Sequence, residues 1–440
     1  MGQLLQNLYN SVDAIVVGNF VGTTALAAVS SSVDIAQLIV GFFSGLSAGA
    51  GVLFSMYFGA KDQKMLHVAI HTTLTFSFFL GLVMVVVGIL LTPVLLRTMA
   101  CPEDVWAEAA LYLRIYMVGI LFTSIYNISA GILRAVGNSR APFFYLAVAS
   151  GSNVVLDFIS VNWLGMGVAG VALATIISQL LSVILIFRDM LLTNDVYKIS
   201  LRDLRINKQL LLKVLGLGLP AGIQNCLIAI SNVFVQRYVN MFGSAAMAGI
   251  GAGKKIDKYA GLTSNSIGLA SATFISQNLG AKQNKRAIHG LRICLLLCSI
   301  VVSLIAIPIY SYASAVIRIF TADEQAVFYG VAMIRTIMPF MFLNALVHVF
   351  ANAVRGFGKS RVVMVMMLIG MVGCRQLFLH LAMQISFDVK NVFYAYPVGW
   401  GSAGLLILAY YILVIRRNYH KWQTQENSSV LTEDYNAPHG

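Results

Sequence analysis

The sequence has few charged residues for its length, and acids are the scarcer kind. Of its 440 residues only 11% are charged, with 17 Asp and Glu against 30 Lys and Arg. A soluble globular protein carries about 25% charged residues, so these side chains are too few to cover a water-soluble body of this size. Hydrophobic residues make up 58% of the chain, and the mean hydropathy is +0.81. The composition excludes a soluble enzyme and a disordered chain, and it predicts a polytopic membrane protein.

Sequence signatures of several other protein classes are missing. The five cysteines are scattered without a Cys-x-x-Cys pair, and their odd number gives no support for a disulfide framework. There is no P-loop, no His-Glu-x-x-His, no Cys/His metal spacing and no Gly-x-Ser-x-Gly. We therefore expect a protein that is not an enzyme, has no cofactor or metal, and takes its energy from an ion gradient rather than from ATP.

Long apolar runs predict twelve membrane-spanning helices, since about 20 apolar residues cross a bilayer. Their approximate ranges are 3–21, 26–54, 68–96, 109–133, 141–162, 167–187, 210–240, 256–279, 287–317, 327–353, 361–384 and 393–415. The first run is polar and starts almost at Met1, so we expect the printed sequence to begin within a truncated first helix. The fold class is an all-α polytopic membrane protein.

The net charge of +13 is explained by topology rather than by nucleic acid. Basic residues gather in the loops that follow even-numbered spans, for example at Lys61 and Lys64, and in the tail at Arg416 and Arg417. The positive-inside rule then places both termini in the cytoplasm. We expect a multi-pass protein of the plasma (inner) membrane of a bacterium that contacts lipid, binds no nucleic acid and acts as a monomer.

Three local patterns recur at one constant offset along the chain. Gly59-Ala60-Lys61 returns as Gly280-Ala281-Lys282, Arg134-x-x-Gly137 returns as Arg355-x-x-Gly358, and Gly22 with Ala25 returns as Gly243 with Ala246. Six spans per half is an even number, so the repeats are parallel, related by a pseudo-two-fold axis along the membrane normal. The predicted domains are residues 1–195, a cytoplasmic linker at 196–209, a second six-helix lobe at 210–416 and a polar tail at 417–440.

Three acids, Asp13, Asp34 and Asp157, lie well inside apolar spans of the first half. Asp34 is expected at a helix N-terminus, where an acid suits the helix dipole. Asp157 follows Asn153 by one helical turn, and Asp13 follows Tyr9 in the same way. A charge at mid-bilayer costs about 2.5–3.5 kcal/mol, so each acid is a candidate functional group. A buried carboxylate could bind a proton, or with neighbouring oxygens Na⁺, and the sequence leaves this open; Asp13 and Asp157 could also be hydrogen-bonded structural groups.

The second half has no equivalent acids. The repeat offset maps Asp13 onto Phe234 and Asp157 onto Phe378. Asp257, near one end of a span in the second half, stands among Lys254, Lys255 and Lys258 and suggests a surface salt-bridge cluster. If carboxylates couple transport to an ion, the coupling site should lie in the first lobe.

The tenth span carries a single polar stripe. Asn344, His348 and Asn352 follow one another at intervals of four, on one face of a helix. Such a stripe either lines a transport cleft or makes hydrogen bonds between helices. Arg375 in the eleventh span also needs polar partners.

Five further motifs are distinctive: Val12-Asp13-Ala-Ile-Val-Val-Gly18, Gly41-Phe-Phe-x-Gly45-Leu46-Ser47-x-Gly49, Gly167-Val-Ala-Gly170-Val-Ala-Leu-Ala-Thr175, Gly218-Leu-Pro220-Ala221 and Gln277-Asn278-Leu279-Gly280. They resemble motifs of the multidrug and toxic compound extrusion (MATE) transporters, in particular of the bacterial and archaeal branch related to DNA-damage-inducible F proteins. The resemblance covers nearly the whole chain up to about residue 418.

This resemblance implies a twelve-helix, two-lobe fold and multidrug efflux in exchange for H⁺ or Na⁺. It also implies a first-lobe cation site made by Asp13, Asn153, Asp157 and Thr175. By position, Tyr9 and Asn127 would be neighbours of that site. Where some relatives carry second-lobe acids, this chain has Gln224 and Asn344, which we expect to line the cleft together with His348 and Asn352.

The sequence thus predicts a secondary active antiporter that exports small amphipathic, often cationic, compounds by alternating access of its two lobes. The alternative is a flippase for lipid-linked oligosaccharides or peptidoglycan precursors from the same superfamily, which would want a strongly basic cavity. A membrane-embedded transferase is disfavoured by the short loops, and a non-transporting sensor by the duplication.

Overall fold

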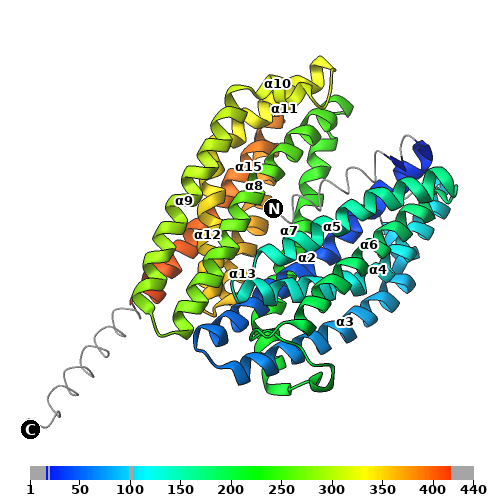
Figure 1. Ribbon diagram of the computed structural model, residues 1–440. Helices are drawn as coiled ribbons and strands as arrows, with labels where there is room; N and C mark the ends of the chain where they lie inside the picture. Colours follow the sequence, from blue (N-terminus) through cyan, green and yellow to red (C-terminus); the bar gives the residue numbers. More distant parts are fainter. Residues whose placement is uncertain (1–15, 18–19, 99–102, 418–440) are drawn as a thin grey trace, which may run out of the picture. The chain divides into compact units, whose positions relative to one another are not determined.

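The structure, a computed structural model, describes residues 16–17, 20–98 and 103–417 (Figure 1). Within these ranges the regular elements are helices, and none is a strand. The first half contains α2 (Thr23–Gly59), α3 (Gln63–Thr98), α4 (Glu103–Ala135), α5 (Arg140–Phe158), the π-helical turn η1 (Ile159–Trp163) and α6 (Gly167–Leu192). A linker with one short 3-10 turn, η2 (Leu201–Asp203), leads to the second half.

The second half repeats this order with more interruptions. It contains α7 (Lys208–Asn240), α8 (Ser244–Gly280), α9 (Asn284–Ser311), α10 (Ala313–Arg318), α11 (Glu324–Ile337), η3 (Met338–Phe340), α12 (Met341–Gly356), α13 (Ser360–Leu368), η4 (Ile369–Cys374), α14 (Arg375–Ile385), α15 (Val389–Tyr410) and η5 (Tyr411–Arg416).

The helices agree with the predicted spans wherever the structure describes them. Spans two to twelve each fall on one helix or on consecutive helices. Of the described helical segments, ten are long and apolar enough to cross a membrane. The less apolar α8, which carries Lys254, Lys255 and Asp257, is not one of the ten. Most of the first predicted span lies outside the described residues. The predicted all-α membrane fold is confirmed.

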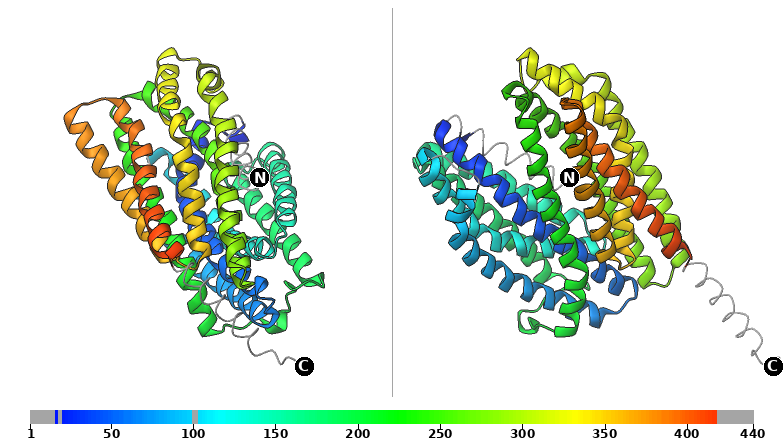
Figure 2. Two further views of the ribbon diagram at one scale, coloured as in Figure 1. Left: turned by 90° about the vertical axis from the view of Figure 1, so that its left-hand side faces the viewer. Right: turned by 180° about the vertical axis from the view of Figure 1, so that it is seen from behind.

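Packing divides the chain into two compact units. The first holds Met1–Ile230, Leu279–Ala281 and Gly358–Met364, and the second holds Ser231–Asn278, Lys282–Phe357 and Val365–Gly440. In the first unit α4 packs against α2, α3 and α6, and α5 packs against α6 (Figure 1). In the second unit α12 packs against α9 and α15, and α15 also packs against α14 (Figure 2). The division falls within α7, so the predicted boundary at 196–209 stays a prediction.

The internal repeat is present in the helix boundaries themselves. α2 and α8 both contain 37 residues, and their first and last residues are separated by the same offset as the repeated sequence motifs. Lys61 and Lys282, equivalent positions of the repeat, both take φ 57°, a left-handed conformation that is uncommon for residues other than glycine. Even one hydrogen bond recurs, because Ser55 Oγ donates to the carbonyl of Ala135 at 3.4 Å, and Ser276 Oγ to that of Gly356 at 3.1 Å. The two halves therefore share one local structure as well as one sequence pattern.

α3 shows how the helices suit a lipid environment. It buries small and polar side chains, among them Thr73, Ser77 and Thr92, and exposes Val83 and Leu90. In the second unit α9, the equivalent of α3 in the repeat, likewise exposes several large apolar side chains: Leu296, Leu297, Ile300, Leu304 and Ile307. Apolar surface of this extent on a monomer marks contact with lipid or another partner. Small buried residues let helices approach closely where lipid provides no hydrophobic drive between them.

One close approach in the second unit gives a testable result. An added Cβ at Gly249 of α8 would collide with the carbonyl oxygen of Ala326 in α11 and stand 2.9 Å from the amide nitrogen of Gly330. Gly251, two residues away, has nothing within 4 Å of such a Cβ. We expect Gly249→Ala to destabilise the protein by about 1–3 kcal/mol through overpacking. Gly251→Ala should leave stability unchanged or raise it by about 1 kcal/mol, because alanine favours the helix. Melting temperatures in detergent test this, and equal shifts for the two variants would contradict the close crossing.

Candidate functional site

The inward face of α5 is polar. Four polar residues lie on this face: Ser150, Asn153 and Asp157 of α5, and Ser160 of η1. All four are at most 8% exposed, and Asp157 is fully buried. Their spacing of three, four and three residues places them on one side of a helix. The opposite side exposes Val155 and other apolar residues. The expected pair Asn153 and Asp157 therefore lies inside the first unit, on a buried polar stripe of four residues.

Neither side-chain atom of Asn153 has a hydrogen-bond partner among the described residues. Buried polar atoms in proteins are nearly always satisfied, and an exception calls for a specific explanation, such as a bound ion or water. An amide oxygen one turn from a carboxylate is also a suitable ligand for a hard cation. The stripe thus has the chemistry of a site for a proton or for Na⁺.

Thr175 lies on α6, which packs against α5. It is 2% exposed, and its hydroxyl donates to the carbonyl of Val171 at 3.0 Å, one turn back on the same helix. The two helices approach closely near Ser160, because a Cβ at Gly170 would stand 2.9 Å from the Cβ of Ser160. Thr175, a predicted site residue, is therefore buried in the same pair of helices as Asp157. Its hydroxyl hydrogen already bonds to a carbonyl of α6.

An apolar cluster occupies the interior of the same unit. It contains residues of four elements and of the first predicted span. These are Val161 of η1, Val168, Val171 and Ala172 of α6, Tyr112 of α4, Ala25 and Val29 of α2, and Val16 and Val17 of that span. Val17 is 0% exposed. Such a surrounding excludes water and strengthens any electrostatic interaction made by a buried charge.

Two of the predicted site residues, Tyr9 and Asp13, lie outside the described residues. Asn127, the other predicted neighbour, is half-buried on α4. The side-chain amide nitrogen of Asn127 donates to the backbone carbonyl of Thr123 at 2.8 Å. The backbone carbonyl of Asn127 accepts from Ser47 Oγ at 2.5 Å. The bond from Ser47 holds α4 to α2.

The residues predicted to line a cleft are mostly buried. Gln224 is 3% exposed in the first unit, whereas Asn344 (7%) and Asn352 (4%) are buried in the second, where His348 is partly exposed. Asn352 donates to the carbonyl of His348 at 2.9 Å and accepts from Arg355 at 3.1 Å. A Cβ at Gly268 of α8 would stand 2.7 Å from the Asn352 amide nitrogen. Both of these hydrogen bonds lie within α12, and the approach of Gly268 is a packing contact. The cleft-lining role and hydrogen bonding between helices therefore both stay predictions.

The second unit has a buried base where the first has a buried acid. The repeat offset maps Asp157 onto Phe378 and Asn153 onto Cys374, and Arg375 follows Cys374 directly. Arg375 is 1% exposed and donates to Asn232 Oδ1 at 2.9 Å and to Ser231 Oγ at 2.6 Å, both on α7. Its guanidinium lies 5.9 Å from the ring centre of Tyr396, the position that corresponds to Thr175. The equivalent helices of the two units thus bury side chains of different chemistry, the acid Asp157 on α5 and the base Arg375 at the start of α14.

A π-helical turn lies beside each buried charge. η1 begins at Ile159, two residues after Asp157, and η4 ends at Cys374, one residue before Arg375. Such turns are rare and often lie at functional sites, since the extra residue re-aims the neighbouring side chains. No motif in the sequence predicted these turns. Ser150 and Ser160 were not predicted either, although they continue the helical spacing of Asn153 and Asp157.

The comparisons with known proteins agree with this architecture. The sequence profile of the family described as MatE matches residues 1–159 and again residues 220–378. "Probable multidrug resistance protein YoeA" of Bacillus subtilis (strain 168) is 29% identical over 431 residues, covering 95% of this chain and 92% of the relative. "Multidrug export protein MepA" of Staphylococcus aureus (strain MRSA252) is 21% identical, covering 82% of this chain and 80% of the relative.

A solved structure shows the same fold. The outward-facing conformation of a multidrug resistance MATE family transporter superposes with a TM-score of 0.88 at 21% identity, covering 96% of this chain and 94% of that one. The matched structures have twelve transmembrane helices in two lobes. The branch related to DNA-damage-inducible F proteins stays a prediction. Because one family profile matches both halves of the chain and together these matches span most of its length, this multi-pass membrane protein belongs to the MATE (MatE) family of transporters.

Proposed function

We propose that this chain is a secondary antiporter that exports small amphipathic, often cationic, compounds in exchange for H⁺ or Na⁺, by alternating access of two lobes. It works in the plasma membrane with both termini in the cytoplasm, and it acts as a monomer. The names of its relatives refer to multidrug resistance and multidrug export, which supports this substrate class.

The observation that carries the proposal is the complete burial of Asp157. It is 0% exposed on the polar stripe of α5, one helical turn after Asn153. The side chain of Asn153 has no hydrogen-bond partner among the residues that the structure describes. A carboxylate in such a position is costly while charged, by about 2.5–3.5 kcal/mol on insertion scales, unless a cation or a proton compensates it. Binding and release of that cation therefore changes the free energy of the first unit, which is what coupling requires.

Asp13 is the proposed second carboxylate of this site. It belongs to the first predicted span, four positions after Tyr9 in the sequence. Val17 of the same span is buried in the cluster that also holds Val161 and Val171. We propose that Asp13 shares the coupling ion with Asp157, with Asn153, Thr175, Tyr9 and Asn127 as neighbours.

The flippase alternative has no comparable support. Two buried bases of the second unit already donate to neighbouring side chains, Arg375 to Ser231 and Asn232, and Arg355 to Asn352. A flippase for anionic lipid-linked precursors would need several such bases free to bind phosphate.

Transport in proteoliposomes tests the proposed function. Purified protein is reconstituted, and the movement of ethidium is followed while a pH gradient and a Na⁺ gradient are imposed separately. We expect one of the two gradients to accelerate ethidium movement by about 5–150-fold, the range of a typical coupling free energy, and its collapse by an ionophore to remove the effect. Transport that responds to neither gradient, or that is equally fast in protein-free liposomes, would contradict antiport.

A further inference from the structure

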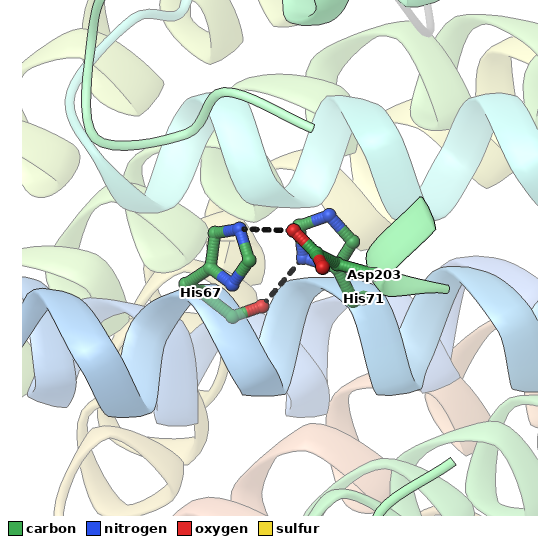
Figure 3. A group of neighbouring side chains, drawn as sticks. All are labelled: His67, His71 and Asp203. Atoms are coloured by element: carbon green, nitrogen blue, oxygen red, sulfur yellow. Dashed lines mark hydrogen bonds and ion pairs between the residues drawn. The ribbon is translucent and has the colours of Figure 1, made fainter. Parts of the chain in front are cut away.

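A second polar cluster lies at the start of α3, away from the proposed coupling site. His67 and His71 are one turn apart on α3, and Asp203 ends the turn η2 in the linker; all three belong to the first unit. Figure 3 shows the His67 imidazole facing the Asp203 carboxylate, with the His71 ring beside them. α3 has 36 residues and is about 54 Å long, so it exceeds the roughly 30 Å of a bilayer core and extends well into the polar region.

The three side chains offer metal ligands at suitable distances. One ligand atom from each lies within 4.8 Å of the other two. His67 Nε2 and Asp203 Oδ2 are 3.6 Å apart, and the ligands of a tetrahedral zinc ion are separated by about 3.4 Å. Two histidines at i and i+4 on a helix present their rings on one face, and here the ring centres are 4.0 Å apart. Bringing all three atoms into one coordination sphere requires side-chain rotations, and His71, which is 1% exposed, must exchange its hydrogen bond from Ser200 for the metal.

Hydrogen bonds already fix the tautomer of His71. Its Nδ1 lies 2.8 Å from the carbonyl of His67 and donates to it, while its Nε2 accepts from the backbone N–H of Ser200 at 2.9 Å. A ring nitrogen that donates to a backbone carbonyl is the usual arrangement around metal-binding histidines, because it directs the lone pair of the other nitrogen outward. A metal ion would take the Nε2 lone pair that Ser200 now occupies.

The linker is held close to α3 by two further hydrogen bonds. Thr72 Oγ1 donates to the carbonyl of Arg205 at 3.3 Å and accepts from the backbone N–H of Asn207 at 3.2 Å. The side chains of His67 and Asp203 remain 39% and 53% exposed, so an ion can reach them. The third ligand is thus preorganised by the linker and accessible from water.

We propose that His67, His71 and Asp203 bind a divalent transition-metal ion, with Zn²⁺ the best suited, and that the ion ties the linker to α3. Two imidazoles and one carboxylate favour zinc and similar borderline metals over Mg²⁺ or Ca²⁺, which prefer oxygen ligands. This assignment does not depend on the proposed antiport. No metal site was expected because the sequence has no local Cys/His motif. Here the third ligand, Asp203, comes from the linker, far along the chain from His71.

Zinc binding by the purified full chain in detergent tests the site, with a chromophoric chelator as competitor. We expect about one Zn²⁺ per chain, and an affinity at least about tenfold lower for His67→Ala and for Asp203→Asn. The matched control is His289→Ala, which removes an exposed histidine of α9. Both cluster residues chosen are partly exposed, so the variants should fold, and equal melting temperatures without zinc verify this. Equal zinc affinity in His67→Ala and the unmodified chain would overturn the proposal.

Limited trypsin digestion provides a second measurement. The linker has exposed cleavage points at Arg202 and Arg205, on either side of Asp203. We expect saturating Zn²⁺ to slow cleavage there in the unmodified chain and in His289→Ala, but not in Asp203→Asn, while Mg²⁺ has no effect. Unchanged cleavage with zinc bound to the unmodified chain would overturn the role of Asp203 as a ligand.

Discussion

Replacing Asp157 with asparagine is expected to abolish the acceleration of efflux by an imposed ion gradient while the protein stays folded. Asparagine has nearly the same shape as aspartate but can neither take up a proton nor hold a full negative charge for Na⁺. Because Asp157 is fully buried on the polar stripe of α5, the substitution also removes the cost of burying a charge. We expect gradient-driven ethidium movement to fall by the whole coupling factor, about 5–150-fold, and the melting temperature to stay equal or rise.

The control for this variant is Asp195→Asn, because Asp195 is an exposed acid of the linker. It changes net charge by the same amount without touching the first-unit interior, and it should transport normally. Measuring Asp13→Asn in parallel tests the proposed sharing of the ion, since loss of coupling in both single variants is expected if the two acids act together. Undiminished gradient-driven efflux by Asp157→Asn would remove this residue from the mechanism.

Replacing Arg375 with leucine is expected to destabilise the second unit strongly. The guanidinium donates to Ser231 and Asn232 at 2.6 and 2.9 Å, and Gln376 Nε2 adds bonds to the hydroxyl and carbonyl of Ser231 at 2.8 Å. Hydrogen bonds to a charged group contribute about 1.5–3 kcal/mol each, so the loss of two costs about 3–6 kcal/mol. A melting temperature lower by many degrees in detergent, with reduced yield, is the expected result.

Arg361→Leu is the matched control, because Arg361 is exposed near the start of the same span. It should leave the melting temperature nearly unchanged, as surface substitutions usually do. An unchanged or higher melting temperature for Arg375→Leu would show that the desolvation cost of the buried guanidinium outweighs its hydrogen bonds, a balance known for buried ion pairs.

The duplication could be read from the sequence because it is a linear property. Lys61 and Lys282 stand at equal positions in two copies of one motif, and the structure gives them the same left-handed φ of 57°. The helices could likewise be predicted, since each apolar run of about 20 residues must satisfy its own backbone hydrogen bonds in lipid. Positions four apart, such as Asn153 and Asp157, share a face for the same helical reason, and both are buried.

Tertiary packing decided which helix faces are turned inward and which side chains contact one another there. Asn344, His348 and Asn352 form one stripe in the sequence, but only the helices around them show that Asn352 packs against Gly268 of α8. The partners of Arg375 lie far earlier in the chain, on α7, and Asp203 meets His67 across a similar distance in the sequence. A periodic pattern fixes directions within one helix, whereas contacts between distant segments depend on how whole helices pack, and no local motif records that.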